Sequence, residues 1–522
     1  MSQEVTAVLI NVTSIQEYIY HSNKLKENIG ASYIIEHKLY NELMRDILKK
    51  KPFGVSDIDL WKKDYEVKIN TNPKISCEVG YIGGGNTLLL FNSESNATQF
   101  IKEFSRETLL RFPGLRLLFG LKNNFNTDDY QNQFRSLMTD LKTRKASFIP
   151  VINVPKHGIT ADCPWSNDSA EVEIQSGRNN IFISMSSKVK IDVTTESLKS
   201  SILEELYEIS NDGYTLTDDI EKLGQENESS YIAVVHIDGN GMGKIFSNIS
   251  SFLEVRKKSS EVSSKAKEAM KKLIEQIIMD IEQIKYKDLD LKKESGKTIL
   301  PIRPILVGGD DITFLCEGKL GVYLAEKFIK FFYNAEDNLM DGACAGVAIV
   351  KTHFPFYKAV KLAEELCAEA KKPTRGNGNA GSYISFYYSA TTFSGTLEEL
   401  RERTHRTKFG KELYNGPYLL ISSDDSNSIK SLKNGIKSFN KKRQKNKNQW
   451  ANNKIMKLRD VLMESEETHM LFLKELNEIN LKLPTLNGQI WNENKTQLFD
   501  QIELMDFYLE ELIDTTHDEV NA

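Results

Sequence analysis

The sequence lacks closely spaced cysteines and long apolar runs, and these two absences exclude several classes of protein. Its five cysteines include no C-x-x-C pair, which argues against a disulfide framework and against a zinc ribbon. We therefore expect them to be reduced thiols in the protein core. They are Cys77, Cys163, Cys316, Cys344 and Cys367.

No apolar run approaches the ~18 residues that a membrane-spanning helix needs, and the N-terminus lacks the basic and apolar regions of a signal peptide. The formal net charge of -5 gives no overall attraction for nucleic acid. With 40% hydrophobic and 27% charged residues, the composition is that of a soluble globular protein. We expect a cytoplasmic protein without a membrane partner, with about three or four domains.

What the sequence does contain is one order of elements that occurs twice. In the first half, residue patterns predict strand, helix, β-hairpin, helix, strand and helix, at residues 6–12, 15–48, 79–91, 97–111, 115–120 and 130–145. The second half repeats this order and adds a last strand, at residues 231–237, 257–284, 305–315, 322–335, 343–350, 357–371 and 383–388. The repetition indicates an internal duplication and an α+β fold.

The remaining segments are predicted to be helical. Residues 194–223 connect the two halves, and after about Ser423 only helices are expected, at 429–463 and 466–512. Within this tail, residues 430–459 contain eleven Lys or Arg and no acid. We therefore predict four parts. A first α+β domain (residues 1–190) is followed by a helical connector (191–228), a second α+β domain (229–425) and a helical C-terminal domain (426–522).

Three carboxylates stand where catalytic metal ions could bind. Asp238 ends an apolar strand, and Asp310 and Asp311 occupy the Gly-Gly-Asp-Asp turn of the next hairpin. If the two strands are neighbours, all three acids face one place, and such crowding of like charges is tolerable mainly where cations bind. Phosphoryl transfer with two Mg²⁺ or Mn²⁺ ions about 4 Å apart uses this kind of oxygen donor set. The pattern predicts a two-metal site that joins nucleotides.

Residues beside these acids could hold a triphosphate. Lys371, at the end of a predicted helix, could bind phosphates, and Gly308-Gly309 permit a tight turn without a Cβ clash. Glycines after Asp238 let backbone N–H groups approach phosphates at a helix start. The candidate phosphate-binding residues after Asp238 are Gly239, Asn240, Gly241 and Gly243.

Each feature also has a simpler interpretation. A Gly-Gly-Asp-Asp sequence often forms only a hairpin turn, Asp238 could cap a helix, and Lys371 could be an ordinary lysine at a helix end. His236 points to the same strand face as Asp238, and a packed core histidine is the simpler interpretation there. The three acids together, in matching strand contexts and in the expected order, favour the metal site.

Longer motifs around these residues carry a family resemblance. The stretches YIAVVHIDGNGMGKIF and PILVGGDDITFLCEG resemble the second palm domain of the large polymerase-like subunit of type III CRISPR effector complexes, and ACAGVAIVKTHFPFYKAVKLAEELCAEAKK extends the match. The N-terminal INVTSIQEYIYHSNKLKENIGASYIIEHKL resembles the first palm. Diguanylate cyclases are more distantly similar. The resemblance implies two ferredoxin-like palm domains of nucleotidyl cyclase or polymerase type, with a helical connector and a helical C-terminal domain.

The resemblance also implies an activity and its site. It implies a nucleotidyltransferase that converts ATP into cyclic oligoadenylate with 3′–5′ linkages, in prokaryotic antiviral defence. Asp238, Asp310 and Asp311 match the family's metal-binding positions, and the backbone of Gly239 is a further candidate ligand.

The first palm lacks the matching acids. Asn11 stands where Asp238 does, and Gly85-Asn86 stand where the Asp310-Asp311 pair does, so no catalytic metal is expected there. The resemblance implies that this palm holds a second ATP against the active one. Ser32, in a Gly-Ala-Ser motif that matches the family, is then a nucleotide contact.

The chain also departs from the family. No His-Asp nuclease domain precedes the first palm, and His517-Asp518 has no metal-ligand context, so we expect no DNase activity. The zinc-binding cysteines common in the family are missing.

The biological setting stays open at this point. The partners are guide or target RNA and other CRISPR effector subunits if the chain works in a complex, and a stand-alone synthetase is the alternative. Lys441, Lys442 and Arg443 could contact an RNA backbone, although a solvated helix or linker is the simpler interpretation. A catalytically silent nucleotide- or RNA-binding scaffold and a cyclic dinucleotide synthase are the alternative functions.

Overall fold

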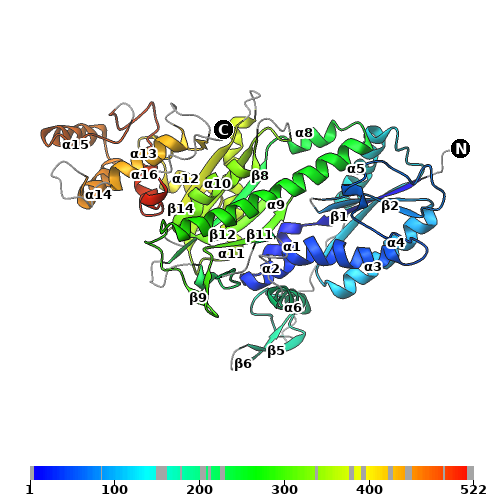
Figure 1. Cartoon of the computed structure of the whole chain (residues 1–522). Coiled ribbons are helices and arrows are strands. Elements are labelled where there is room, and N and C mark those ends of the chain that lie inside the picture. The colour runs from blue at the N-terminus through cyan, green and yellow to red at the C-terminus, as the bar shows by residue number, and fades with distance from the viewer. Residues whose placement is uncertain are drawn as a thin grey trace. The chain divides into compact units, whose positions relative to one another are not determined.

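The structure is a computed structural model of the chain (Figure 1). It describes residues 5–83, 85–147, 161–176, 179–199, 207–209, 213–223, 230–334, 339–375, 381–389, 395–420, 427–440, 450–485 and 488–513. The chain divides into two compact units. The first comprises Met1–Asn211, Gly241–Glu268 and Ile305–Ile312, and the second comprises Asp212–Asn240, Ala269–Pro304 and Thr313–Ala522.

The first unit is built around a four-stranded antiparallel sheet in the order β2-β3-β1-β4. Its strands are β1 (Thr6–Thr13), β2 (Cys77–Gly83), β3 (Asn86–Phe91) and β4 (Arg116–Lys122). The apolar runs that predicted these strands supply the core, because β1 and β3 lie in the middle of the sheet and are almost completely buried. Helices α4 (Glu94–Arg111) and α5 (Tyr130–Ser147) pack against the sheet (Figure 1).

The predicted helix at 15–48 is wrong as a single element. It is divided into α1 (Ile15–Tyr20), α2 (Leu25–Tyr33), a π-helix (Ile34–Met44) and α3 (Arg45–Lys49). The side chain of Asn28 fills the interruption after α1, because its amide donates to the carbonyl oxygens of Ile19 (2.6 Å) and Ser22 (3.1 Å). This side chain takes over carbonyl groups that a continuous helix would have bonded internally.

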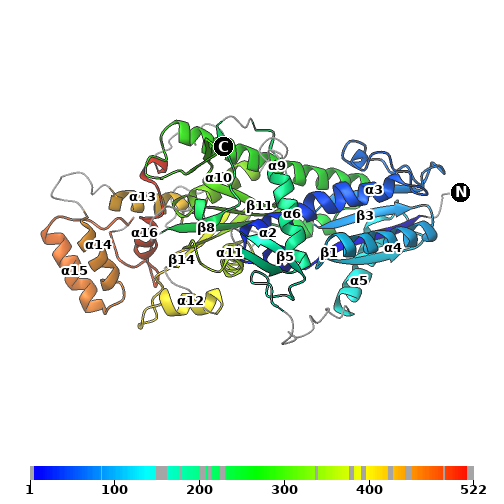
Figure 2. The same cartoon turned by 90° about the horizontal axis from the view of Figure 1, so that it is seen from below.

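A further hairpin and helix join the first unit after α5. They are β5 (Val172–Ser176), β6 (Asn179–Ile183) and α6 (Met185–Lys199), which packs along α2 (Figure 2). Buried hydrogen bonds fasten the start of α6. Ser184 Oγ donates to Ser187 Oγ (3.1 Å), and Ser187 and Ser22 donate to the two carboxylate oxygens of Glu27 at 2.7 and 2.8 Å.

The predicted connector helix at 194–223 is wrong in two respects among the described residues. Helix α6 begins earlier, at Met185. Tyr214–Thr215 form strand β7, which pairs with β10 (Lys297–Ile299) beside β9 (Lys293–Glu294) in a small sheet of the second unit. Strand pairing with residues more than eighty positions away cannot be inferred from local periodicity. The domain boundaries proposed from the sequence stay predictions.

The main sheet of the second half has six strands in the order β11-β12-β8-β13-β14-β15. Its first four strands repeat the order found in the first unit, which confirms the duplication and the α+β fold with two ferredoxin-like sheets. The strands are β8 (Tyr231–Gly239), β11 (Ile302–Gly308), β12 (Asp311–Glu317), β13 (Ala343–Lys351), β14 (Tyr383–Ser389) and β15 (Tyr418–Leu419). The turn between β11 and β12 belongs to the first unit, and most of β12 belongs to the second.

Helices complete this half. Helices α10 (Gly321–Phe332) and α11 (Phe356–Ala370) pack against β8 and β13, and the long α9 (Phe252–Glu282) has residues in both units. Single-turn helices occur at Leu60–Lys62, Ile220–Lys222, Gly318–Leu320, Lys372–Thr374 and Glu510–Leu512. None of the helices in the described residues is both long and apolar enough to cross a membrane.

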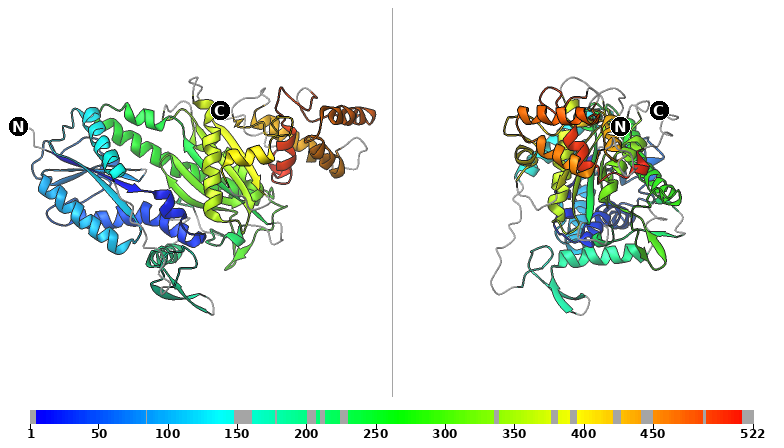
Figure 3. Two further views of the ribbon diagram at one scale, coloured as in Figure 1. Left: turned by 180° about the vertical axis from the view of Figure 1, so that it is seen from behind. Right: turned by 90° about the vertical axis from the view of Figure 1, so that its left-hand side faces the viewer.

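The C-terminal part of the second unit is helical, as predicted, and its helices lie beyond the strands (Figure 3). The two long helices expected there are wrong, however. The described residues form α12 (Leu397–Thr404), α13 (Ile429–Asn440), α14 (Asn452–Val461), α15 (Glu466–Glu478) and α16 (Leu498–Leu504). Ser465 caps the start of α15, and Asn480 just after its end has a φ of 52°, a left-handed conformation that terminates helices.

Helix α16 carries a fully buried carboxyl group, that of Asp500. Its Oδ2 accepts hydrogen bonds from the backbone N–H of Asn415 (2.9 Å) and from the Tyr418 hydroxyl. Burial raises the pKa of Asp500 to about 8, against the smaller opposing effects of these hydrogen bonds and of Arg401. This carboxyl group is therefore protonated in the folded protein near neutral pH.

This raised pKa predicts a pH-dependent loss of stability. An unfolded Asp ionises near pH 4, so from about pH 4 to pH 8 the unfolded state loses a proton that the folded state keeps, and stability falls by up to about 1.4 kcal/mol per pH unit. Asp500→Asn retains an acceptor oxygen and removes this titration. We expect its melting temperature to fall less than that of the wild type between pH 5 and pH 7. The exposed Asp506→Asn serves as the control, and equal slopes for all three proteins would contradict the assignment.

Candidate functional site

Asp238 and Lys371 form an ion pair in the second unit. Asp238 is the last but one residue of β8, and Lys371 follows the last residue of α11. The Lys371 ammonium lies 2.5 Å from Asp238 Oδ2 and donates to the backbone carbonyl oxygen of Gly239 at 3.2 Å. The Asp238 side chain is 38% exposed and that of Lys371 only 13%. A solvent-accessible carboxylate thus has a lysine held against it.

Contacts with β13 hold the end of α11 next to this ion pair. Cys344, which lies opposite Asp238 in the β8–β13 register, is buried against Cys367 and Ala370. The Cys367 thiol donates to the Cys344 carbonyl oxygen (3.2 Å), and the Asn240 amide donates to Cys344 Sγ (3.3 Å). Asn240, predicted as a nucleotide contact, is itself only 5% exposed. The Asn240 backbone N–H donates to the Gly342 carbonyl oxygen (2.8 Å), and the Asn240 carbonyl oxygen accepts from the backbone N–H of Asp341 (3.1 Å). Both the side chain and the backbone of Asn240 therefore have partners within the protein.

Two of the predicted glycines are required by backbone conformation. Gly241 has a φ of 77° where it precedes helix α8 (Met242–Ser247), and Gly309 has a φ of 70° in the Gly-Gly-Asp-Asp turn. L side chains rarely adopt either value. A Cβ on Gly243 would meet no atom within 4 Å, and one on Gly308 would make only ordinary contacts. The open space at Gly243 leaves its backbone accessible.

The Gly-Gly-Asp-Asp turn contacts the helical part of the first unit through Glu36. The backbone N–H of Val307, just before Gly308, donates to Glu36 Oε1 at 3.1 Å. Ser32, which the sequence suggested as a nucleotide contact, is buried and hydrogen-bonds to the same carboxylate. Burial raises the pKa of Glu36 against both of these bonds. Ser32 and the residue before the Gly-Gly-Asp-Asp sequence are therefore joined through one side chain. Sequence reasoning missed Glu36, although it lies in the stretch that resembles the first palm, because no local pattern distinguishes it.

The positions in the first sheet that match the acids carry a pair of amides. Asn11 of β1 lies opposite Asn86 of β3 in the antiparallel register, and the Asn11 amide donates to Asn86 Oδ1 at 2.8 Å. Both turns contain a glycine with a positive φ, Gly85 (71°) and Gly309 (70°), although Gly85 stands where Asp310 does and Gly309 lies one residue earlier in its turn. In the first sheet, neutral side chains that bond to each other replace the acids.

His236 is a core residue. It is 6% exposed, and its Nδ1 lies 3.1 Å from the Thr313 hydroxyl of β12, the strand next to β8 in the sheet. Burial lowers the pKa of His236 below its usual value. A neutral packed imidazole agrees with the simpler interpretation of this histidine.

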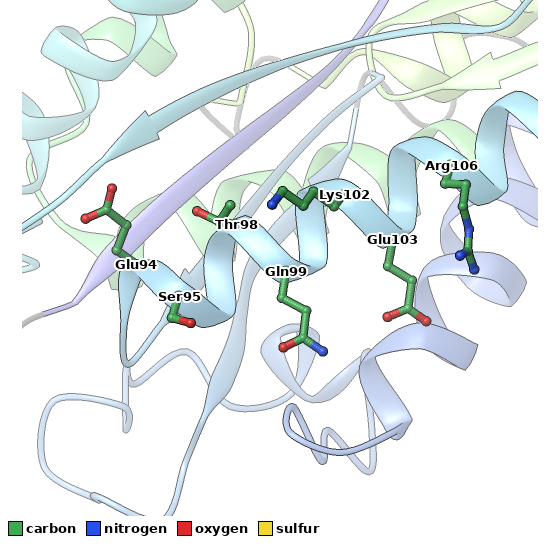
Figure 4. Close-up of a pocket in the computed structure, with 7 residues that line it drawn as sticks. All are labelled: Glu94, Ser95, Thr98, Gln99, Lys102, Glu103 and Arg106. Carbon is green, nitrogen blue, oxygen red and sulfur yellow. The ribbon is translucent and has the colours of Figure 1, made fainter.

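Other features do not add to the site. Lys441, Lys442 and Arg443 lie outside the described residues. A surface hollow is lined by residues of helix α4 alone and contains no predicted site residue (Figure 4). No group of three or more His, Cys, Asp or Glu side chains that could hold a metal ion occurs in the part of the chain that the structure describes. All five cysteines are buried and unpaired with each other, as predicted.

Comparison with known proteins identifies the second half. Residues 231–380 match the family model of the Cas10/Cmr2 second palm domain. This part of the chain is Cas10-like. This confirms the resemblance drawn from the motifs around Asp238 and Asp310. No curated protein matches the sequence.

Solved structures share the fold of the chain. They include a Csm1–Csm4 cassette in complex with AMPPNP (12% identity, TM-score 0.52) and one in complex with one ATP (12% identity, TM-score 0.50). Csm1 from T. onnurineus is also similar (13% identity, TM-score 0.48). Each match covers 98% of this chain and 70% of the other. At such identities the similarity shows the fold alone.

Proposed function

We propose that this Cas10-like chain is a nucleotidyltransferase that joins ATP into cyclic oligoadenylate at a metal site formed by Asp238, Asp310 and Asp311. The observation that carries the proposal is the difference between the two sheets. The second has acids at the end of β8 and on the hairpin turn, and the first has the bonded pair Asn11–Asn86 at the matching positions. One sheet is thus suited to binding metal ions, and the other is not.

Strand register supports the convergence of these acids. In the first sheet Asn11 and Asn86 are directly opposite in antiparallel strands. In the second half His236 and Thr313 are in contact, and they lie two residues before Asp238 and two residues after Asp311. Asn11 and Asn86 have the same offsets from Leu9 and Leu88, which are opposed in the first sheet. Asp238 and Asp311 therefore stand at the strand positions that match Asn11 and Asn86.

The chemistry of these donors fits two Mg²⁺ or Mn²⁺ ions. Such ions prefer carboxylate and carbonyl oxygens and complete their coordination with water and substrate phosphates, so a set of three acids with the Gly239 carbonyl is sufficient. When bound, they would supply charge neutralisation at the phosphates and an acidified hydroxyl. Asp238 is accessible enough to take part, since its side chain is 38% exposed.

The chain's own residues would position two nucleotides. The backbone of Gly239–Gly243 and the Lys371 ammonium would hold the triphosphate of one ATP. The first palm, with Ser32, would hold a second ATP, whose 3′ oxygen attacks the α-phosphorus of the first. One P–O bond forms as the bond to pyrophosphate breaks, and the hydroxyl proton goes to solvent. The step repeats, and attack of the terminal 3′ oxygen on the α-phosphorus of the 5′ triphosphate then closes the ring and releases a further pyrophosphate.

Product analysis tests the proposal. The purified chain is incubated with ATP and Mg²⁺ or Mn²⁺, and products are separated by ion-exchange chromatography and identified by mass spectrometry. Cyclic oligoadenylates are expected, and their loss with EDTA is the metal control. Parallel reactions with GTP distinguish a cyclic dinucleotide synthase. Reactions with added RNA and effector subunits test whether the chain works within a CRISPR complex. Nucleotide binding without products in any of these reactions would favour a silent scaffold.

A further inference from the structure

Lys371 occupies the place that a divalent cation would take on one side of the proposed site. Its ammonium contacts Asp238 Oδ2 at 2.5 Å and the Gly239 carbonyl oxygen at 3.2 Å. These are the same two groups that the proposed function gives to a metal ion. A metal ion and this ammonium therefore compete for the same oxygens, because both are cations that bind by electrostatic attraction.

The position of Lys371 is built into the fold. Its backbone N–H donates to the Cys367 carbonyl oxygen at 3.0 Å, and its own carbonyl oxygen accepts from the Thr374 hydroxyl at 2.9 Å. The buried contacts of Cys344 with Cys367 and Ala370 hold the end of α11 beside the end of β8. The Lys371 side chain is only 13% exposed, so an ammonium moved away from Asp238 would need another anion within its reach.

We propose that Lys371 is an internal counter-ion that keeps the Asp238 side of the site closed to metal ions until a nucleotide triphosphate draws the ammonium away. The inference rests on the proposed function and adds a regulation to it, because metal binding at Asp238 becomes coupled to nucleotide binding. The coupling is reciprocal, so the same free energy appears when metal strengthens nucleotide binding. Lys371 acts here as a positioning residue, and its phosphate contact alone would not produce this coupling.

The test measures Mn²⁺ binding to the full chain, using the electron paramagnetic resonance signal of the free ion. Binding is measured with and without an ATP analogue that has a methylene group between the α- and β-phosphorus atoms. Lys371→Met is compared with the wild type and with Lys372→Met, the exposed neighbouring lysine. Without nucleotide, Lys371→Met is expected to bind Mn²⁺ about tenfold more tightly than the wild type, since a charged hydrogen bond to Asp238 no longer competes. Lys372→Met is expected to match the wild type.

The second readout is the coupling itself. In the wild type the analogue should tighten Mn²⁺ binding, and in Lys371→Met this tightening should shrink by about the same tenfold factor. Adding Asp238→Asn to both proteins should remove the difference between them, and circular dichroism checks that each variant is folded. The wild type and Lys371→Met could have equal Mn²⁺ affinities without nucleotide and still bind Mn²⁺ tightly when the analogue is present. This outcome would overturn only the counter-ion inference. Absence of Mn²⁺ binding to every protein under every condition would overturn the proposed metal site as well.

Discussion

The double variant Asp310→Ala/Asp311→Ala is expected to lower the rate of oligoadenylate formation from ATP by about 10³-fold or more. In the proposed site these two carboxylates provide most of the negative charge that holds the metal ions, and loss of metal-ion catalysis removes several kcal/mol of transition-state stabilisation. The measurement is the initial rate of product formation by ion-exchange chromatography at saturating ATP and metal. Each single variant shows which of the two carboxylates matters more.

The fold should tolerate this change. Gly309, whose φ of 70° shapes the turn, is retained, and removing adjacent like charges does not remove apolar core. A matched control is Asp128→Ala/Asp129→Ala, another adjacent acidic pair in the first unit. It should keep full activity although the Asp129 carboxylate accepts hydrogen bonds from the side-chain amides of Asn132 and Gln133. Undiminished synthesis in a folded Asp310/Asp311 double variant would sink the proposed site.

The second large effect concerns Arg256, on the first turns of α9. Its side chain is 1% exposed. Its guanidinium pairs with Glu78 Oε1 (2.8 Å) and donates to the backbone carbonyl oxygens of Glu66 (2.7 Å), Val79 (2.7 Å) and Gly80 (2.9 Å). Arg256→Met would leave the Glu78 carboxylate without this partner and the carbonyl groups without a donor. Breaking a buried ion pair by removing one partner costs about 3–5 kcal/mol.

This cost should appear as a lower melting temperature and faster amide hydrogen exchange in β2. Lys257→Met is the matched control, because Lys257 is the next residue of the same helix and is exposed. Its ammonium lies 3.9 Å from the Glu261 carboxylate, in an exposed ion pair. Exposed pairs of this kind contribute about 0–1 kcal/mol. A melting temperature for Arg256→Met equal to that of the Lys257→Met control would show that the buried network contributes nothing.

Much of the architecture was accessible from the sequence because its signals are local. Strands β1 and β8 are mostly apolar, and both hairpins have glycines at the turn, where Gly85 and Gly309 adopt positive φ. Elements of this kind depend on neighbouring residues alone. The helix at 15–48 and the pairing of β7 were not predictable, because a side chain at Asn28 and a strand far along the chain decide them.

The candidate site divides in the same way. By itself the sequence determined that one half carries Asp238, Asp310 and Asp311 and that the other carries amides at the matching positions, because residue identity within a repeated order of elements needs no coordinates. Only the tertiary structure decided that Lys371 lies against Asp238 and that Glu36 joins Ser32 to the residue before the acidic turn. These contacts join residues far apart in the chain, and packing of the helices against the sheets brings them together.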